Sequence, residues 1–201
     1  MCQMNKSDVL KGYEAGNSFK GEELIRIDLS HIKLVKVDFS EANLQFAEFK
    51  DTNLSESNFN YADLSNANLS GAILRKAFLV GANLTNANQE RTDLRGAFLG
   101  GSTLSSTNFR DANLKGAIIG SPNWIALDTF SAHTNFEGAN LENTIFGETT
   151  PKGVSMLGAK LTNAYLYEVN FSESVYHPQQ LEEAIINKIV QSSPVKPAQP
   201  K

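Results

Sequence analysis

The side chains best suited to chemistry are widely separated along this 201-residue chain. Its three histidines are His31, His133 and His177, and its only cysteine is Cys2. A histidine beside a carboxylate can act as a general base, and a cluster of His and Cys can hold zinc. These four residues do not have the spacing of metal ligands. Because the sequence also lacks a nucleophile elbow and a glycine-rich phosphate loop, we expect no enzyme activity and no cofactor.

The charge balance excludes several classes of partner. The chain has 22 acidic and 18 basic residues, with a formal charge of -4. Such a chain has no overall attraction to nucleic acid or to an anionic membrane. It contains no run of about 18 apolar residues that could span a bilayer, and its N-terminus lacks the apolar core of a secretory signal. We therefore expect a cytoplasmic protein that binds neither membranes nor, directly, nucleic acids.

A five-residue period organises most of the sequence. Leu or Phe recurs at every fifth position from Leu24 to Leu84 and from Leu94 to Leu114, and Ile119 continues the series. A small side chain, usually Ala, Ser or Thr, lies two residues before most of these positions, and Asn or Asp often lies between the two. A period of five fits neither the 3.6-residue repeat of an α-helix nor the alternation of a β-strand. The chain must therefore turn in another way.

The segments EANLQ, YADLS, GANLT and DANLK resemble the A(D/N)LXX consensus of the pentapeptide-repeat family. The resemblance extends from Leu24 to Phe171 and is closest to the small soluble members common in photosynthetic bacteria. It implies an all-β solenoid, a right-handed quadrilateral β-helix with four repeats per coil and about seven coils. The Leu or Phe and the small residue would point inward. Residues 20 positions apart would then stack on one another at about 4.8 Å.

Breaks in the period predict the organisation of the chain. An N-terminal helix with Ser7 as its N-cap and Gly16 at its end would cover one end of the core. A second helix, with Pro178 in its first turn, would cap the other end. The expected segments are an N-terminal segment with the capping helix (1–20), a first part of the β-helix (21–120), an inserted loop (121–133), a second part (134–175) with a loop near 149–155, a C-terminal capping helix (177–191) and a disordered tail (192–201).

Gln89 occupies a position where the period requires Leu. Stacking at intervals of 20 residues would place its side chain between Leu69 and Phe109. A buried amide without hydrogen bonds is costly. We expect either that the core widens so that Gln89 bonds backbone carbonyls, or that its side chain rotates outward.

The candidate partner-binding face is a column of cations. Arg75, Arg95 and Lys115 are 20 residues apart, with Lys76 beside the column and Arg91 at the preceding corner. Such a column could bind an acidic partner, or it could be a solvated face neutralised by salt bridges. Trp124, in the inserted loop, is a second candidate because an exposed aromatic residue can anchor a partner. It could instead fold back to fill the break in the repeat.

The sequence favours a non-catalytic interaction or scaffold protein, monomeric because both ends look capped, with an unknown protein partner. The alternative comes from the resemblance. Some members of the family mimic DNA and bind type II topoisomerases, protecting them from quinolones. Between Ser121 and Val190 the chain has eight acidic residues against three lysines, as mimicry requires. The cationic column and the modest net charge count against it.

Overall fold

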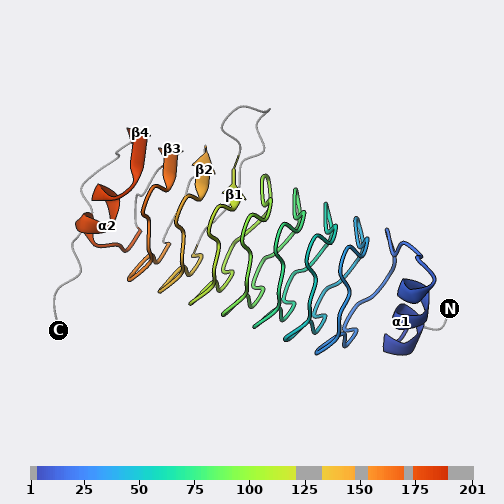
Figure 1. Cartoon of the computed structure of the whole chain (residues 1–201). Coiled ribbons are helices and arrows are strands. Elements are labelled where there is room, and N and C mark those ends of the chain that lie inside the picture. Colours follow the sequence, from blue (N-terminus) through green and yellow to red (C-terminus); the bar gives the residue numbers. More distant parts are fainter. Residues whose placement is uncertain (1–3, 121–132, 148–153, 170–173, 190–201) are drawn as a thin grey trace.

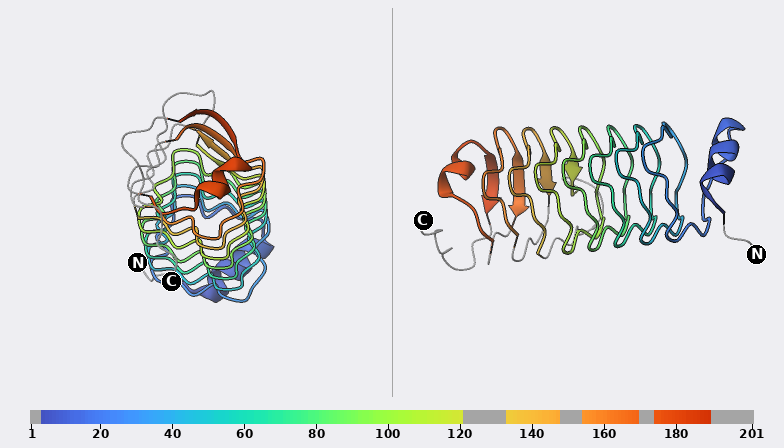
Figure 2. Two further views of the ribbon diagram at one scale, coloured as in Figure 1. Left: turned by 90° about the vertical axis from the view of Figure 1, so that its left-hand side faces the viewer. Right: turned by 90° about the horizontal axis from the view of Figure 1, so that it is seen from below.

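The chain winds into a rod of stacked coils (Figure 1). The computed structural model describes residues 4–120, 133–147, 154–169 and 174–189. Parallel bridges join residues 20 apart, as in Asn43 to Asp63 and Asp63 to Asn83, and the chain turns once in every five residues. Each coil therefore consists of four five-residue units. Viewed along its axis, the rod is four-sided (Figure 2).

Left-handed backbone conformations make the corners. One residue in each unit has a positive φ, including bulky residues such as Phe46 at 58° and Tyr61 at 60°. This conformation is unfavourable for residues other than glycine. It is stabilised here by hydrogen bonds to the next coil, since the amides of Phe46 and Tyr61 donate to the carbonyls of Ser65 and Val80.

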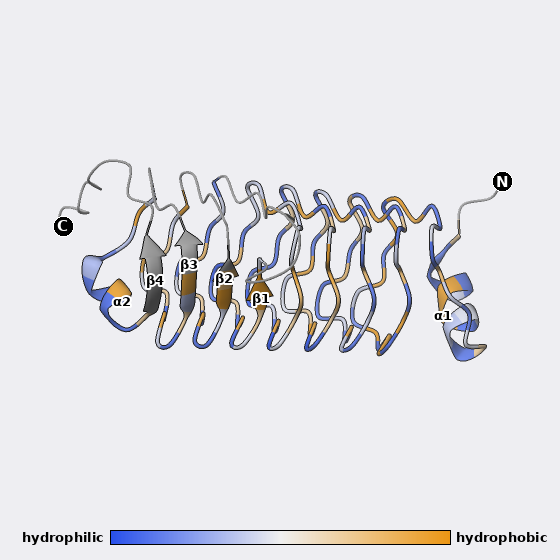
Figure 3. Cartoon of the chain, turned by 90° about the horizontal axis from the view of Figure 1, so that it is seen from above, coloured by the Kyte–Doolittle hydropathy of each residue, from blue (hydrophilic) through white to orange (hydrophobic). Residues whose placement is uncertain are grey.

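The core is filled by the residues that define the five-residue period. The leucines at the positions of the period, such as Leu24, Leu84 and Leu166, are fully buried, and the rings of Phe39 and Phe59 stack with centroids 5.5 Å apart. Threonine fits the small slot because its hydroxyl finds a backbone acceptor. Thr107 Oγ1, for example, donates to the Leu84 carbonyl at 2.7 Å. The alternation of polar and apolar residues is visible along every coil (Figure 3).

Asparagines form hydrogen-bonded ladders on the outside. One column begins at Asp28 and Glu48 and continues through Asn68, Asn88 and Asn108. The Asn68 amide donates to Glu48 at 2.8 Å, and the Asn108 amide donates to Asn88 at 3.3 Å. The prediction that residues 20 positions apart stack on one another is confirmed for these columns.

The two helices lie at the ends of the rod, and the four strands follow one another from its middle to its C-terminal end (Figure 1). Helix α1 (Lys6–Glu14) lies at the N-terminal end, where Val9 is fully buried. Strands β1 (Ile118–Ile119), β2 (Ile145–Gly147), β3 (Tyr165–Val169) and β4 (Ile185–Ile189) form a parallel sheet in that order. Helix α2 (Pro178–Glu182) precedes β4.

The prediction that Ser7 caps the first helix is wrong. Asn5 is the N-cap, and its side chain accepts hydrogen bonds from the amides of Ser7 and Asp8 at 2.8 and 3.2 Å. Asp8 Oδ2 accepts in return from the Asn5 amide at 3.0 Å. This reciprocal capping box satisfies more of the free amides than a hydroxyl at position 7 could.

The C-terminal helix predicted over 177–191 is too long. Helix α2 ends at Glu182, and Ile185–Ile189 forms β4, which pairs in parallel with β3. A strand here continues the sheet and satisfies the backbone groups of β3, which a helix would leave unpaired. Three isoleucines in five residues also favour a strand.

Gln89 neither bonds backbone carbonyls in a widened core nor turns its side chain outward, so both predictions for it are wrong. Its side chain is fully buried, and neither the amide nitrogen nor the oxygen has a hydrogen-bond partner among the described residues. The backbone of the unit remains regular, since the Gln89 amide donates to the Asn108 carbonyl at 2.8 Å. The ladder of hydrogen bonds between coils therefore holds the side chain in the core.

The insertions can be located only from the residues that flank them. Asn108 pairs with Asn135, so one coil contains seven residues more than the usual 20. Most of the predicted loop, including Trp124, lies outside the described residues, as does most of the loop near 149–155 and the whole tail. Ser155, expected in a loop, bridges Asn135 and Val175 and belongs to a regular coil.

Candidate interaction surface

The predicted cations do stack along one corner of the rod, but each is paired with a carboxylate. Arg75, Arg95 and Lys115 form what we call the basic corner. Arg75 and Arg95 both bond Asp93, with closest distances of 2.7 and 2.9 Å. Lys115 Nζ lies 2.8 Å from Glu142 Oε2. Two guanidinium groups share one carboxylate, so this corner retains part of its positive charge.

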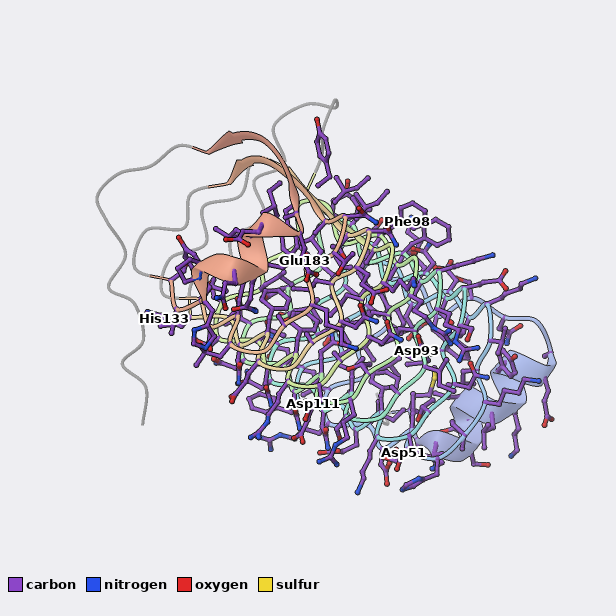
Figure 4. All side chains as sticks on the ribbon, turned by 60° about the vertical axis from the view of Figure 1, so that its left-hand side comes forward. Asp51, Asp93, Phe98, Asp111, His133 and Glu183 are labelled. Carbon is purple, nitrogen blue, oxygen red and sulfur yellow. The ribbon has the colours of Figure 1, made fainter. Side chains whose placement is uncertain are left out.

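The position of Asp93 is stabilised electrostatically. Partial burial raises the pKa of its carboxyl group, but the hydrogen bonds from Arg95 and Arg75 outweigh burial and lower the pKa below 3.8. The carboxylate is therefore held in its charged form. Asp93 and Asp111 both lie on the outside of the rod (Figure 4).

Arg91 and Lys76, the two cations beside the basic corner, differ in their ion pairing. Arg91 lies at the preceding corner, 3.1 Å from Glu90. Lys76 is exposed, and no ion pair is found for it among the described residues. The candidate Trp124 lies outside the described residues, so the structure does not place it beside these cations.

One face of the rod carries an apolar column in the slot where Asn or Asp is usual. Asp38 and Asn58 begin this column, and the bridges then join five apolar residues in sequence. We call them the outer apolar stripe: Phe78, Phe98, Ile118, Ile145 and Tyr165. Phe78 is 41% exposed and the others are partly exposed. Strands β1 and β2 show as hydrophobic segments in Figure 3.

The stripe borders a cleft at its N-terminal end. The cleft has a volume of about 450 Å³ and is lined by Lys36, Glu56, Lys76, Phe78, Gly96 and Phe98. The rings of Phe78 and Phe98 stack in parallel, 5.2 Å apart and inclined by 5°. Phe98 projects from the outside of the rod (Figure 4). We call this hollow the aromatic cleft.

Comparison with known proteins identifies the family. The sequence model of pentapeptide repeats matches eight copies, over residues 23–60, 62–97, 90–119 and 134–173. The chain belongs to the pentapeptide-repeat family. No match was found among curated proteins.

Several solved structures are similar to the chain, HetL and QnrB1 among them. HetL, involved in heterocyst differentiation regulation in the cyanobacterium Nostoc sp. strain PCC 7120, is 24% identical; the alignment covers 91% of this chain and 93% of HetL, with a TM-score of 0.39. QnrB1, a plasmid-mediated fluoroquinolone resistance protein, is 15% identical over 79% of this chain and 81% of QnrB1, with a TM-score of 0.58. At this identity the likeness to QnrB1 shows the shared right-handed β-helix and nothing about function.

The pentapeptide repeat itself could have revealed the stripe. Phe78, Phe98 and Ile118 occupy the slot that its consensus gives to Asn or Asp, and they are 20 residues apart. The inserted residues hide the continuation, because Ile118 and Ile145 are 27 apart. A fixed interval of 20 residues therefore identifies the column only as far as Ile118.

The titratable side chains of the described residues lie apart from one another or in exposed pairs. Within them, no group of three or more His, Cys, Asp or Glu residues could hold a metal ion. His31 lies 3.5 Å from Asp51, and both side chains are at least half exposed. Such a pair lacks the enclosed setting in which an acid and a base are tuned for catalysis. Across the same residues, no helix is long and apolar enough to cross a membrane.

Proposed function

We propose that this pentapeptide-repeat protein is a non-catalytic interaction module that binds a protein partner through the outer apolar stripe. The observation that supports this proposal is the replacement of the usual Asn or Asp by five apolar residues in consecutive coils. Continuous exposed apolar surface is uncommon on soluble proteins and is typical of binding sites.

Folding alone does not require the stripe. The core lies on the other side of the backbone, and the Asn ladders show which residues suit the outer slot. An apolar side chain in that slot gives up a hydrogen bond along the rod. In return the side chain is buried only in part, since Phe78 keeps 41% of its surface exposed.

The structure of the two ends of the rod favours a monomer as the functional form of the protein. Val9 of α1 is fully buried, and the Tyr13 hydroxyl donates to the Val35 carbonyl at 3.0 Å. At the other end, β4 pairs with β3. We infer that α1 and the segment α2–β4 cap the rod, so that its sides, rather than its ends, meet the partner. We also propose a cytoplasmic location.

Affinity capture with three forms of the immobilised protein tests the proposal. The first is the wild-type chain, and the second carries Phe98→Asn and Ile118→Asn, which restore the residue usual in this slot. The third reverses the basic corner with Arg75→Glu, Arg95→Glu and Lys115→Glu. We expect the second form to lose the captured protein and the third to keep it. Loss only with the third form would assign binding to the basic corner instead.

DNA mimicry is the alternative function. The rod fold shared with QnrB1 and the acidic C-terminal part of the sequence are compatible with it. The basic corner interrupts the negative surface that mimicry needs. A supercoiling assay with DNA gyrase tests this alternative. Inhibition, or protection from a quinolone, at micromolar concentrations of the protein would favour mimicry over the proposal.

A further inference from the structure

We propose that the aromatic cleft binds a segment of the partner protein in which an apolar side chain lies next to a carboxylate. This inference rests on the proposed function and specifies the chemistry of the partner. It follows from the two unlike walls of the cleft, one aromatic and one formed by a column of charged residues.

The aromatic wall fits an apolar side chain. Phe78 and Phe98 stack on each other, so their relative position is fixed. Rigid aromatic rings give a large contact area at low entropic cost. The cleft volume of about 450 Å³ lies in the range of roughly 300–1,000 Å³ that is usual for binding pockets.

The charged wall favours a partner segment with a negatively charged side chain over one with a positively charged side chain. Lys36 is paired with Glu56 at 3.5 Å, whereas Lys76, the next cation in the column, has no carboxylate within 4.0 Å among the described residues. An incoming carboxylate can pair with Lys76 without breaking an existing ion pair. An incoming cation would have to compete with Lys36 for Glu56.

One of the residues that line the cleft is a glycine. Gly96 lies at a corner with a φ of 66°, and a Cβ atom there would lie 3.6 Å from Lys76 Cγ. Because Gly96 has no side chain, the space beside the lysine stem stays open, and glycine in such a place permits the close approach of another backbone.

A selection experiment tests the chemistry directly. A phage library of random twelve-residue peptides is selected on the full wild-type chain and depleted on the Phe78→Ala, Phe98→Ala variant. We expect the recovered peptides to carry Asp or Glu within two residues of an aromatic or aliphatic residue. The inference would be overturned if no recovered peptide bound the wild-type chain in preference to the variant. It would also be overturned if the recovered peptides had no acidic residue.

Substitutions at two lysines then measure what the positive charge contributes to the binding of a recovered peptide. Lys76 and Lys36 have similar left-handed φ values of 56° and 61° and lie in the same column. We expect Lys76→Gln to weaken a recovered peptide at least tenfold and Lys36→Gln to change its affinity less than twofold. Equal losses would contradict a specific role for Lys76. Selection on Lys76→Glu should in turn recover peptides with Lys or Arg in place of the acid.

The outcomes separate this inference from the proposed function. If the stripe variant loses the captured partner while Lys76→Gln retains it fully, the stripe binds the partner and the inference about the cleft is wrong. If neither variant loses the partner, the proposed function itself fails.

Discussion

The guanidinium of Arg95 holds the carboxylate of Asp93 in a bidentate pair, with Nε and Nη2 each 2.9 Å from an oxygen. Bidentate geometry is the stronger form of this interaction. Asp93 also accepts from Arg75 at 2.7 Å, so a single carboxylate bridges two consecutive coils at the basic corner. The three side chains therefore link the coils as well as setting the charge of the surface.

Acid should weaken this link, and Asp93→Asn tests it. The pKa of Asp93 is lowered in the folded state because the hydrogen bonds from Arg95 and Arg75 outweigh partial burial. The stabilisation is therefore present above the unfolded pKa of about 3.8 and is lost as pH falls through the lower folded value. We expect Asp93→Asn to cost about 1 kcal/mol at pH 7, after allowance for solvent exposure.

Urea unfolding of both proteins between pH 7 and pH 3 measures this effect. The difference between them should shrink below pH 4. Asp111→Asn is the control, because Asp111 belongs to an exposed pair with Arg110 at 3.8 Å. A difference that stays constant with pH would show that Asp93 acts by packing and not by charge.

The capping box of α1 leads to a second prediction. Asn5→Ala removes the acceptor for the amides of Ser7 and Asp8 and should cost about 1 kcal/mol of helix stability. Ser7→Ala should be nearly neutral because Ser7 contributes only its backbone amide to the cap. Hydrogen exchange of the α1 amides measures both. Faster exchange in Ser7→Ala than in Asn5→Ala would restore Ser7 as the cap.

Gln89→Leu should stabilise the protein. Neither polar atom of the buried amide has a hydrogen-bond partner in the described part of the chain, and an unsatisfied buried group costs about 1–3 kcal/mol. Leucine supplies the side chain that the repeat uses at this position. We expect the free energy of unfolding in urea to rise by about 1–2 kcal/mol.

Leu84→Gln provides the comparison for Gln89→Leu. It places a second amide at an equivalent buried position and should destabilise the rod. A wild-type protein more stable than Gln89→Leu would mean that Gln89 makes hydrogen bonds, for example to a buried water.

The five-residue period predicts the coils because the same physical constraint acts in every unit. A narrow core admits Leu or Phe at one slot and a small residue at the other, as Leu44 and Ala42 illustrate. The two ends cannot be predicted in this way. The spacing of apolar residues in 185–189 is compatible with a helix. The segment forms a strand because it pairs with β3, and the sequence does not show this pairing.

The candidate surface was harder to predict than the fold. Stacking at intervals of 20 residues correctly aligns Arg75, Arg95 and Lys115, but it does not show that Asp93 and Glu142 pair with them. Side-chain length and direction decide those contacts. The outer apolar stripe is harder to recognise in the sequence, because the core leucines and phenylalanines dominate the apolar pattern and the spacing changes from 20 to 27 residues after Ile118.

Phe98→Asn separates the stripe from the core. Phe98 lies outside the rod, so its loss should cost about 1 kcal/mol, the value of one aromatic stacking contact. Phe59→Ala should cost about 3–5 kcal/mol, because Phe59 is fully buried and its removal leaves a cavity. Thermal and urea unfolding of the two variants measure the difference. If Phe98→Asn were as damaging as Phe59→Ala, the stripe would be a structural element of the rod and its proposed role in binding would lose its basis.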